Sequence, residues 1–169
     1  VSDYYAINPE FGEMTDLDAL VTLAHQLDIK VILDWVPNHT GYDHVWINSH
    51  PRYYTLNKQG EPQVPRDKSG KLTDWTDVAE LNYENMELRQ AMLDALLYWV
   101  QKHHIDGFRF DMAELVPLDF WHQVYKSLSA YNCFLIGESQ DPSYFDRAFQ
   151  VQYGWSFHHL MKDIAMGKT

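Results

Sequence analysis

The 169-residue sequence has little of several residue classes, and each shortage excludes a class of protein. Its one cysteine, Cys133, cannot form an intrachain disulfide, and a cluster of thiolate metal ligands is excluded. Lys and Arg number 13 against 24 Asp and Glu, and the net charge of −11 argues against nucleic-acid or anionic-membrane partners. The longest apolar runs, such as residues 95–100, are far shorter than the roughly 20 residues of a membrane span. A neutral substrate fits this composition better, and nothing indicates the compartment.

What the sequence does contain is an alternation of helical and strand periodicity. A helix is expected from Thr15, with Asp18 placed to complete a capping box. Its predicted buried stripe consists of Leu17, Leu20, Val21, Ala24 and Leu27. Residues 30–36 then form a short β-branched apolar run that ends at Pro37, which is typical of a parallel strand buried on both faces.

Further helix and strand patterns follow in alternation. The predicted helices cover 88–104, 118–131 and 155–166, and the predicted strands cover 107–111, 133–138 and 149–153. This alternation implies right-handed crossovers and a parallel sheet. No glycine-rich phosphate loop follows a strand, which disfavours nucleotide binding. An open doubly wound sheet and a (β/α)8 barrel remain as α/β architectures.

Residues 38–85 differ from the rest because they contain no long periodic stretch and are rich in proline, glycine and aromatic residues. A loop of this length inside a compact domain is usually functional. Its aromatic residues Trp46, Tyr53, Tyr54 and Trp75 are interpreted mainly as packing residues of a small subdomain.

Carboxylates lie at the C-terminal ends of three predicted strands, where barrel enzymes place their chemistry. They are Asp34, Asp111 and Glu138. Asp111 and Glu138 follow successive strands and should converge on one rim, as the carboxyl pair of a retaining glycosidase does at about 5 Å. Arg109, two residues before Asp111 on the same face, would keep that carboxylate ionised and aimed. Burial and the nearby Asp111 charge would favour a protonated Glu138.

Alone, an Arg-x-Asp motif is more often a structural ion pair. The combination is more specific, because residues 31–40 (VILDWVPNHT) resemble the first signature region of the alpha-amylase superfamily, glycoside hydrolase family 13. Residues 107–111 (GFRFD) resemble the second region and residues 134–139 (FLIGES) the third. Residues 77–82 (DVAELN) resemble the fifth, which that family carries in a domain inserted after its third barrel strand. The four regions occur in the order that the family has, and the resemblance covers nearly the whole chain.

The resemblance implies a partial TIM (β/α)8 barrel, roughly its strands 3 to 6. Residues 1–39 and 86–169 would belong to this barrel, and residues 40–85 would form an inserted loop-rich subdomain. The fourth signature region, which carries a third catalytic aspartate, is absent from the sequence. We therefore expect the chain to be a central fragment of a longer protein and to be inactive alone.

The resemblance also implies roles for individual residues. Asp111 would be the nucleophile, Glu138 the general acid/base and Arg109 the partner of Asp111. His39 would donate to sugar hydroxyls beside the scissile bond, and Asp34 would be structural or bind substrate.

Calcium is implied more weakly. Asn38 would brace the inserted subdomain, in many members of the family through Ca²⁺. Two departures bear on this site: Leu115 stands where many alpha-amylases have a calcium-associated histidine, and Glu80 stands where they have an aspartate ligand. No cofactor is expected to be required.

The function predicted from the sequence is that of a retaining alpha-glycosidase. It would act on alpha-linked glucans or malto-oligosaccharides through a covalent glycosyl-aspartate intermediate. A transglycosidase and a non-catalytic carbohydrate-binding or scaffold relative of the same fold are the alternatives. An unrelated barrel that binds Mg²⁺ would need a further acidic ligand on a neighbouring strand end. Linkage specificity is not indicated.

Overall fold

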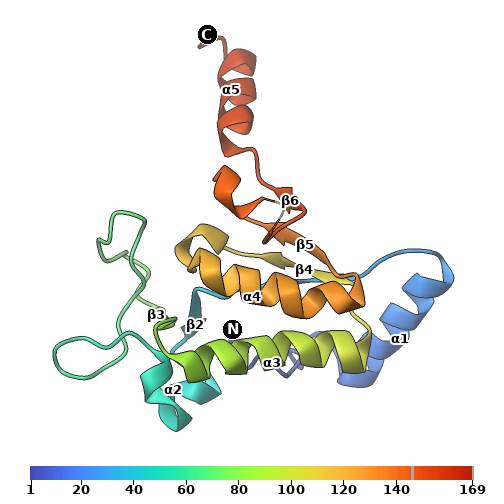
Figure 1. The fold of residues 1–169 in the computed structure, drawn as a ribbon, viewed down its shortest axis with the longest axis horizontal. Coiled ribbons are helices and arrows are strands. Elements are labelled where there is room, and N and C mark those ends of the chain that lie inside the picture. Colours follow the sequence, from blue (N-terminus) through green and yellow to red (C-terminus); the bar gives the residue numbers. More distant parts are fainter. Residues whose placement is uncertain (146, 169) are drawn as a thin grey trace.

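The computed structural model describes residues 1–145 and 147–168, and the chain forms a sheet covered by helices with a loop-rich extension at one end (Figure 1). The α-helices of these residues are α1 (Met14–Gln26), α2 (Val45–Ser49), α3 (Met86–His103), α4 (Leu118–Leu128) and α5 (Trp155–Ala165). The strands are β1 (Ile32–Trp35), β2 (His39–Gly41), β3 (Val78–Glu80), β4 (Gly107–Phe110), β5 (Phe134–Gly137) and β6 (Val151–Gln152). The predicted alternation of helices and strands is confirmed.

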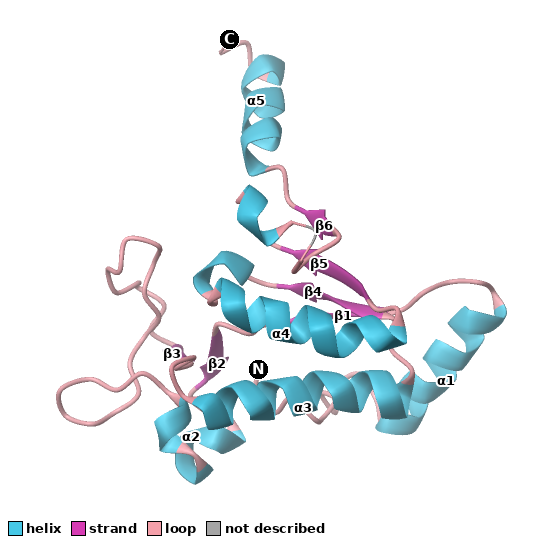
Figure 2. Cartoon of the chain, viewed as in Figure 1, coloured by secondary structure: helices cyan, strands magenta, loops and turns pink. Residues whose placement is uncertain are grey.

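The main sheet contains four parallel strands in the order β1-β4-β5-β6. The order in space follows the order along the chain, with α3 between β1 and β4 and α4 between β4 and β5. Figure 2 shows α3 and α4 side by side over this sheet. The α/β class and the parallel sheet are therefore as predicted, and all four C-terminal strand ends point to the same rim.

The core lies between this sheet and its helices and is strongly aromatic. Phe108 and Phe110 of β4 are fully buried, because β4 is an inner strand and both side chains lie on its helix-covered face, whereas Arg109 between them is partly exposed. The Phe110 ring lies 4.6 Å from that of Trp121 in α4, and Trp121 lies 5.0 Å from Phe149. Each such side chain stabilises the fold by about 1.5–3 kcal/mol through burial, so the strand before Asp111 is firmly anchored.

The start and the buried face of α1 differ from the prediction. The helix begins at Met14, and the Glu13 N–H donates to the Asp16 carboxylate at 2.7 Å, so the predicted cap at Thr15 and Asp18 is wrong. The predicted stripe is also wrong for Leu20 and Leu27, which are exposed. The chain places α3 against only one side of α1, and Val21 is the buried residue of the helix.

The segment between β1 and α3 has more order than its sequence suggested. Strands β2 and β3 form a two-stranded antiparallel sheet in which His39 pairs with Glu80. Trp46, Tyr53 and Tyr54 are buried, which confirms them as packing residues. Beyond them the chain extends as two exposed loops (Figure 1).

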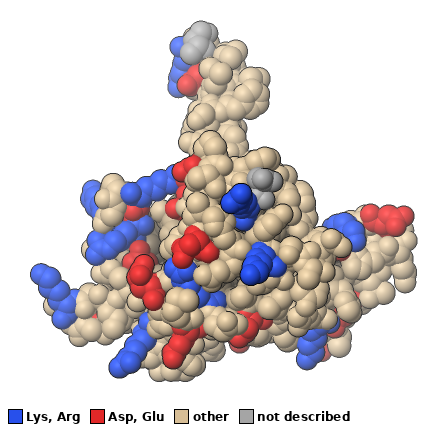
Figure 3. Space-filling model, in the orientation of Figure 1, with Lys and Arg blue, Asp and Glu red and all other residues tan. Residues whose placement is uncertain are grey.

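The helix α5 extends away from the rest of the chain (Figure 1) and carries few charges below its tip (Figure 3). Its exposed apolar side chains are Phe157, Leu160, Met161 and Ile164. Within residues 1–145 and 147–168, no helix combines the length and the apolar character that crossing a membrane requires.

Candidate active site

Three carboxylates meet at the C-terminal rim of the parallel sheet. Asp34 lies in β1, Asp111 directly follows β4 and Glu138 directly follows β5. The strand ladder continues into the last two, because the Asp111 N–H donates to the Trp35 carbonyl at 2.8 Å and the Glu138 N–H to the Phe110 carbonyl at 2.9 Å. Both backbones are therefore fixed where the side chains project.

One guanidinium joins all three carboxylates. The Nη1 atom of Arg109 lies 2.8 Å from Asp111 and 3.0 Å from Asp34, and its Nη2 lies 2.9 Å from Glu138. The sequence predicted an Arg109–Asp111 pair but not the contacts to the other two carboxylates. At this rim, three carboxyl groups therefore share one guanidinium.

The three carboxylates differ in exposure. The side chain of Glu138 is 16% exposed and that of Asp111 28%, whereas that of Asp34 is 69% exposed. The Met112 N–H also donates to Glu138 at 2.9 Å. Met112 adopts a left-handed backbone with φ 46°, an uncommon conformation for a side-chain-bearing residue that tends to occur at functional sites. This turn aims its N–H from the end of β4 toward β5.

The surroundings of Arg109 keep it charged. Burial opposes its charged form, but hydrogen bonds to Asp34, Tyr153 and Asp111 outweigh that effect and raise its pKa above the ordinary value. The guanidinium is thus a permanent cation between the carboxylates. Tyr153, which follows β6, was not singled out from the sequence; its only signal there was its place at the end of the predicted strand 149–153.

His39 lies beside Asp111 as a neutral imidazole. Burial lowers the pKa of His39, while the Asp111 carboxylate acts in the opposite direction. The Asn38 side-chain amide lies 3.3 Å from the His39 Nδ1 and donates to it, which leaves the proton of the neutral ring on Nε2. The ring of Trp75 lies 5.5 Å away. His39 can therefore donate one hydrogen bond from Nε2.

The segment that delivers His39 is held at three consecutive carbonyls. The carbonyls of Val36, Pro37 and Asn38 accept hydrogen bonds from the Tyr4 hydroxyl at 2.7 Å, the Tyr83 hydroxyl at 2.7 Å and the Leu81 N–H at 3.1 Å, respectively. Each donor comes from a different part of the sequence than β1. The link between the parallel sheet and β2 is therefore rigid.

Two hollows open beside the carboxylates. One of about 310 Å³ is lined by His39, Trp75, Asp77, Val78, Asp111 and Met112. The other, of about 110 Å³, includes Glu138, Met112, Gln140 and Trp155 in its lining. A ligand that occupied both would reach Asp111 on one side and Glu138 on the other.

An ion pair that the sequence did not reveal closes the second hollow. Lys68, from an exposed loop before β3, pairs with Glu114 after β4. Glu114 also accepts the backbone N–H groups of Gln140 and Asp141, just beyond Glu138. This contact joins the loop to the rim.

The described residues around Asn38 do not match a calcium site. Calcium takes six to eight oxygen ligands, and of the candidate residues the Glu80 carboxylate is engaged, since it accepts the Arg66 N–H at 2.8 Å. In the described ranges, no three Asp, Glu, His or Cys side chains are grouped to hold a metal ion. At the rim, Arg109 supplies the positive charge among the acidic groups.

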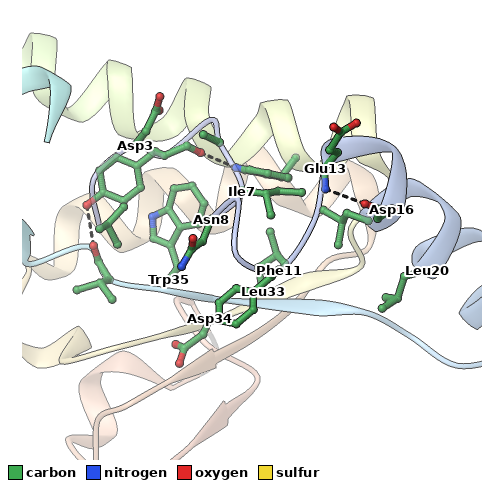
Figure 4. A pocket seen from close by; sticks show the side chains of 16 residues that line it. Asp3, Ile7, Asn8, Phe11, Glu13, Asp16, Leu20, Leu33, Asp34 and Trp35 are labelled. Carbon is green, nitrogen blue, oxygen red and sulfur yellow. Dashed lines mark hydrogen bonds between the residues drawn. The ribbon is translucent and has the colours of Figure 1, made fainter.

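A separate cavity of about 540 Å³ lies between the N-terminal segment, α1 and β1, and its lining is mostly apolar (Figure 4). Figure 4 shows Phe11, Ile7 and Leu33 around it, while the Asp34 carboxylate lies on the other side of β1 from Trp35. The cavity does not contain Arg109, Asp111 or Glu138. It is therefore distinct from the two hollows beside Asp111 and Glu138, although Asp34 lines it.

Comparison with known sequences gives one family. The family model for the alpha-amylase catalytic domain matches residues 1–163. Alpha-amylase 3 of Dictyoglomus thermophilum is 30% identical over an alignment that covers 85% of this chain and 33% of that relative. Trehalose-6-phosphate hydrolase of Bacillus subtilis is 30% identical, with 99% of this chain and 40% of that relative covered.

Comparison with solved structures gives the same family. A maltogenic alpha-amylase from Thermotoga neapolitana superposes with a TM-score of 0.89 at 35% identity, covering 100% of this chain and 38% of that structure. An alpha-amylase from Lactobacillus plantarum gives a TM-score of 0.89 at 35% identity and covers 100% of this chain and 42% of that structure. The chain spans well under half the length of the relatives named here.

Proposed function

This chain belongs to the alpha-amylase family of catalytic domains, and we propose that the full-length protein is a retaining alpha-glycosidase of alpha-linked glucans or malto-oligosaccharides. The observation that carries the proposal is the single guanidinium of Arg109 that contacts both Asp111 and Glu138. Two carboxyl groups on adjacent nitrogens of one planar group are close together. Retaining enzymes use a separation of about 5–5.5 Å, whereas inverting enzymes use about 6.5–9.5 Å.

The same proposal extends to the architecture. Strands β1, β4, β5 and β6 would be strands 3 to 6 of a (β/α)8 barrel, in keeping with their parallel sequential order. Residues 40–85 would be the subdomain inserted after the first of them.

In the first step, an Asp111 oxygen attacks the anomeric carbon of the substrate. The bond from that carbon to the glycosidic oxygen breaks, its electron pair stays on the oxygen, and Glu138 gives that oxygen a proton. The products are a neutral glycosyl ester on Asp111 and an ionised Glu138. The negative charge moves from one carboxyl group to the other, and Arg109 already contacts both.

In the second step, Glu138 takes a proton from water, and the water oxygen attacks the anomeric carbon while the ester bond to Asp111 breaks. Two inversions restore the α configuration. If a sugar hydroxyl replaces water, the result is transglycosylation, so the two activities share one intermediate.

His39 and Asp34 serve substrate binding in this proposal. His39 lines the same hollow as Asp111, and its Nε2–H would donate to a sugar hydroxyl. Asp34 is largely exposed and adjusts the position of Arg109 from the other side. No step requires a metal ion or a cofactor.

The test is covalent labelling of the full-length protein with an activated fluoro-α-glucoside, read by intact mass and peptide mapping. We expect one glucosyl adduct, on Asp111. D111N, checked for folding by circular dichroism, is the matched control and should acquire none.

An adduct on another residue would refute the assignment of Asp111. No adduct with several such probes, together with no release of sugar from malto-oligosaccharides, would favour the non-catalytic carbohydrate-binding alternative. Proton NMR of the first product formed completes the test, because a β-configured product would exclude retention.

A further inference from the structure

Tyr153 contacts the charged cluster without belonging to it. Its hydroxyl accepts a hydrogen bond from the Arg109 Nε at 3.0 Å, and the guanidinium carbon lies 5.4 Å from the centre of its ring. The Tyr153 N–H donates to the Ser139 carbonyl at 3.0 Å, next to Glu138. The backbone of Tyr153 is therefore fixed beside the strand end that carries Glu138, and its hydroxyl holds the one nitrogen of Arg109 that no carboxylate occupies.

The contacts of Arg109 with Asp111 and Glu138 depend on how the plane of its guanidinium group is oriented. Its two terminal nitrogens contact Asp111 and Glu138, and a guanidinium is rigid and planar. A hydrogen bond at Nε therefore fixes where both terminal nitrogens point. In the described part of the chain, no other ion pair involves either carboxylate, so a rotation of Arg109 would leave both without their cation.

The contact of Tyr153 with Arg109 does not depend on the charge of Asp111 or Glu138, unlike the contacts that these two carboxyl groups make with Arg109. In the proposed reaction Asp111 becomes a neutral ester while Glu138 becomes ionised, so the attraction of each for Arg109 changes during every turnover. The phenol is neutral throughout. Its hydrogen bond and its ring contact persist while the negative charge passes from one carboxyl group to the other.

We infer that Tyr153 is a positioning residue, which holds the Arg109 guanidinium across Asp111 and Glu138 while charge moves between them. The inference rests on the proposed function. It goes further in assigning a task to a residue directly after β6, which contacts Arg109 and not the carboxyl groups proposed to react.

The test is Y153F in the full-length protein, with Y144F as the matched control. The Tyr144 hydroxyl donates to the Val116 carbonyl at 3.4 Å, and its ring stacks on Phe149, so this control removes a hydroxyl away from the rim. Both variants are measured by kcat and KM across pH with 4-nitrophenyl α-glucoside and maltotriose, after melting curves show that they are folded.

We expect kcat of Y153F to fall about tenfold with KM changed less than about twofold, since the contact acts on the reacting groups. Y144F should match the wild type. An unchanged kcat, or a KM changed as much as kcat, would refute the inference.

A second measurement does not need activity. In protein labelled with ¹⁵N-arginine, the Arg109 Nε–H signal is assigned by its loss in R109K, and its exchange with water is measured. We expect slow exchange in the wild type and in Y144F and faster exchange in Y153F. An active enzyme whose Nε–H is indifferent to Y153F would refute the inference. A protected Nε–H in a protein that cleaves no α-glucoside would instead refute the proposed function and leave the contact standing.

Discussion

The two ends of the parallel sheet each carry an ionic cluster, but the clusters are balanced differently. At the N-terminal end, the Asp106 carboxylate is hydrogen-bonded to the His25 ring at 2.7 Å, the Lys30 ammonium group at 2.9 Å and the Val31 N–H at 2.8 Å. At the C-terminal rim, three carboxylates share one cation, Arg109. The first cluster has three donors for one carboxylate, whereas the second has one cation for three carboxyl groups. A satisfied cluster stabilises the fold, whereas an unsatisfied one retains groups that can react.

The largest expected effect follows removal of the proposed nucleophile. D111N should lower kcat on malto-oligosaccharides by on the order of 10⁴-fold, because no other carboxylate is placed to form the covalent intermediate. The melting temperature should not fall, since the substitution removes one of three carboxyl groups that share a single cation. Steady-state kinetics and calorimetry of the same preparation check both points. A large drop in melting temperature would show that the cluster at the C-terminal rim also stabilises the fold, against the contrast between the two ends of the sheet.

Removal of the proposed acid should have the next largest effect. E138Q should lower kcat by about 10²–10⁴-fold on malto-oligosaccharides, the usual contribution of general acid catalysis. The loss should be much smaller for a substrate with a good leaving group, such as 2,4-dinitrophenyl α-glucoside, since that group departs without a proton. Equal losses on both substrates would argue against the acid role.

The opposite result is expected at the N-terminal end. D106N should lower the free energy of unfolding by about 2–3 kcal/mol, because charge-assisted hydrogen bonds are among the stronger ones. The value of kcat should stay unchanged. Urea unfolding of the full-length protein measures the difference, and D74N, at an exposed aspartate, is the control. A D106N variant with wild-type stability would show that the cluster is not structural.

The stabilising effect of Asp106 should also depend on pH. Burial raises its pKa, but hydrogen bonds from the Val31 N–H, His25 and Lys30 outweigh this, and the pKa lies below its ordinary value. A carboxylate with a lowered pKa in the folded state stabilises above its unfolded pKa, about 3.9, and loses that effect as the pH falls through the folded pKa. The stability difference between wild type and D106N should therefore be constant from pH 7 to 5 and shrink below about pH 4. A difference that did not shrink below about pH 4 would contradict this dependence.

The smallest expected effect is at the exposed member of the rim. D34N should change kcat/KM less than about fivefold, because an ion pair with a largely exposed partner contributes about 0–1 kcal/mol. Steady-state kinetics at two salt concentrations measures it. A loss of a hundredfold or more would move Asp34 from a supporting role to a direct contact with the substrate.

The sequence predicted the sheet well because buried parallel strands have a distinctive composition. The apolar runs before Pro37, Asp111 and Glu138 became three neighbouring strands, and the carboxylates fell at their ends as the pattern required. Periodicity alone does not say what covers a helix, however. For this reason Leu20 and Leu27 were wrongly assigned to a buried face.

Contacts between distant segments were beyond the sequence for a different reason. Tyr153 was part of a weak strand pattern, and nothing in its neighbourhood indicates a hydrogen bond to a residue 44 positions earlier. Lys68 lies in an exposed loop of ordinary polar composition, and its contact with Glu114 depends on how that loop returns to the rim. Such pairs are decided by the folded path of the chain, which local patterns do not encode.

The three held carbonyls after β1 have a consequence for how this chain can evolve. The carbonyls of Val36, Pro37 and Asn38 are fixed by groups outside the exposed loops, and β2 and β3 close the base of those loops. Lengthening or replacing residues 57–61 or 67–71 would therefore leave the position of His39 unchanged. Variation in these loops can alter which ligands approach the rim while the groups proposed to carry out the chemistry stay in place. Substrate selectivity can therefore change in evolution without a change in the reacting groups.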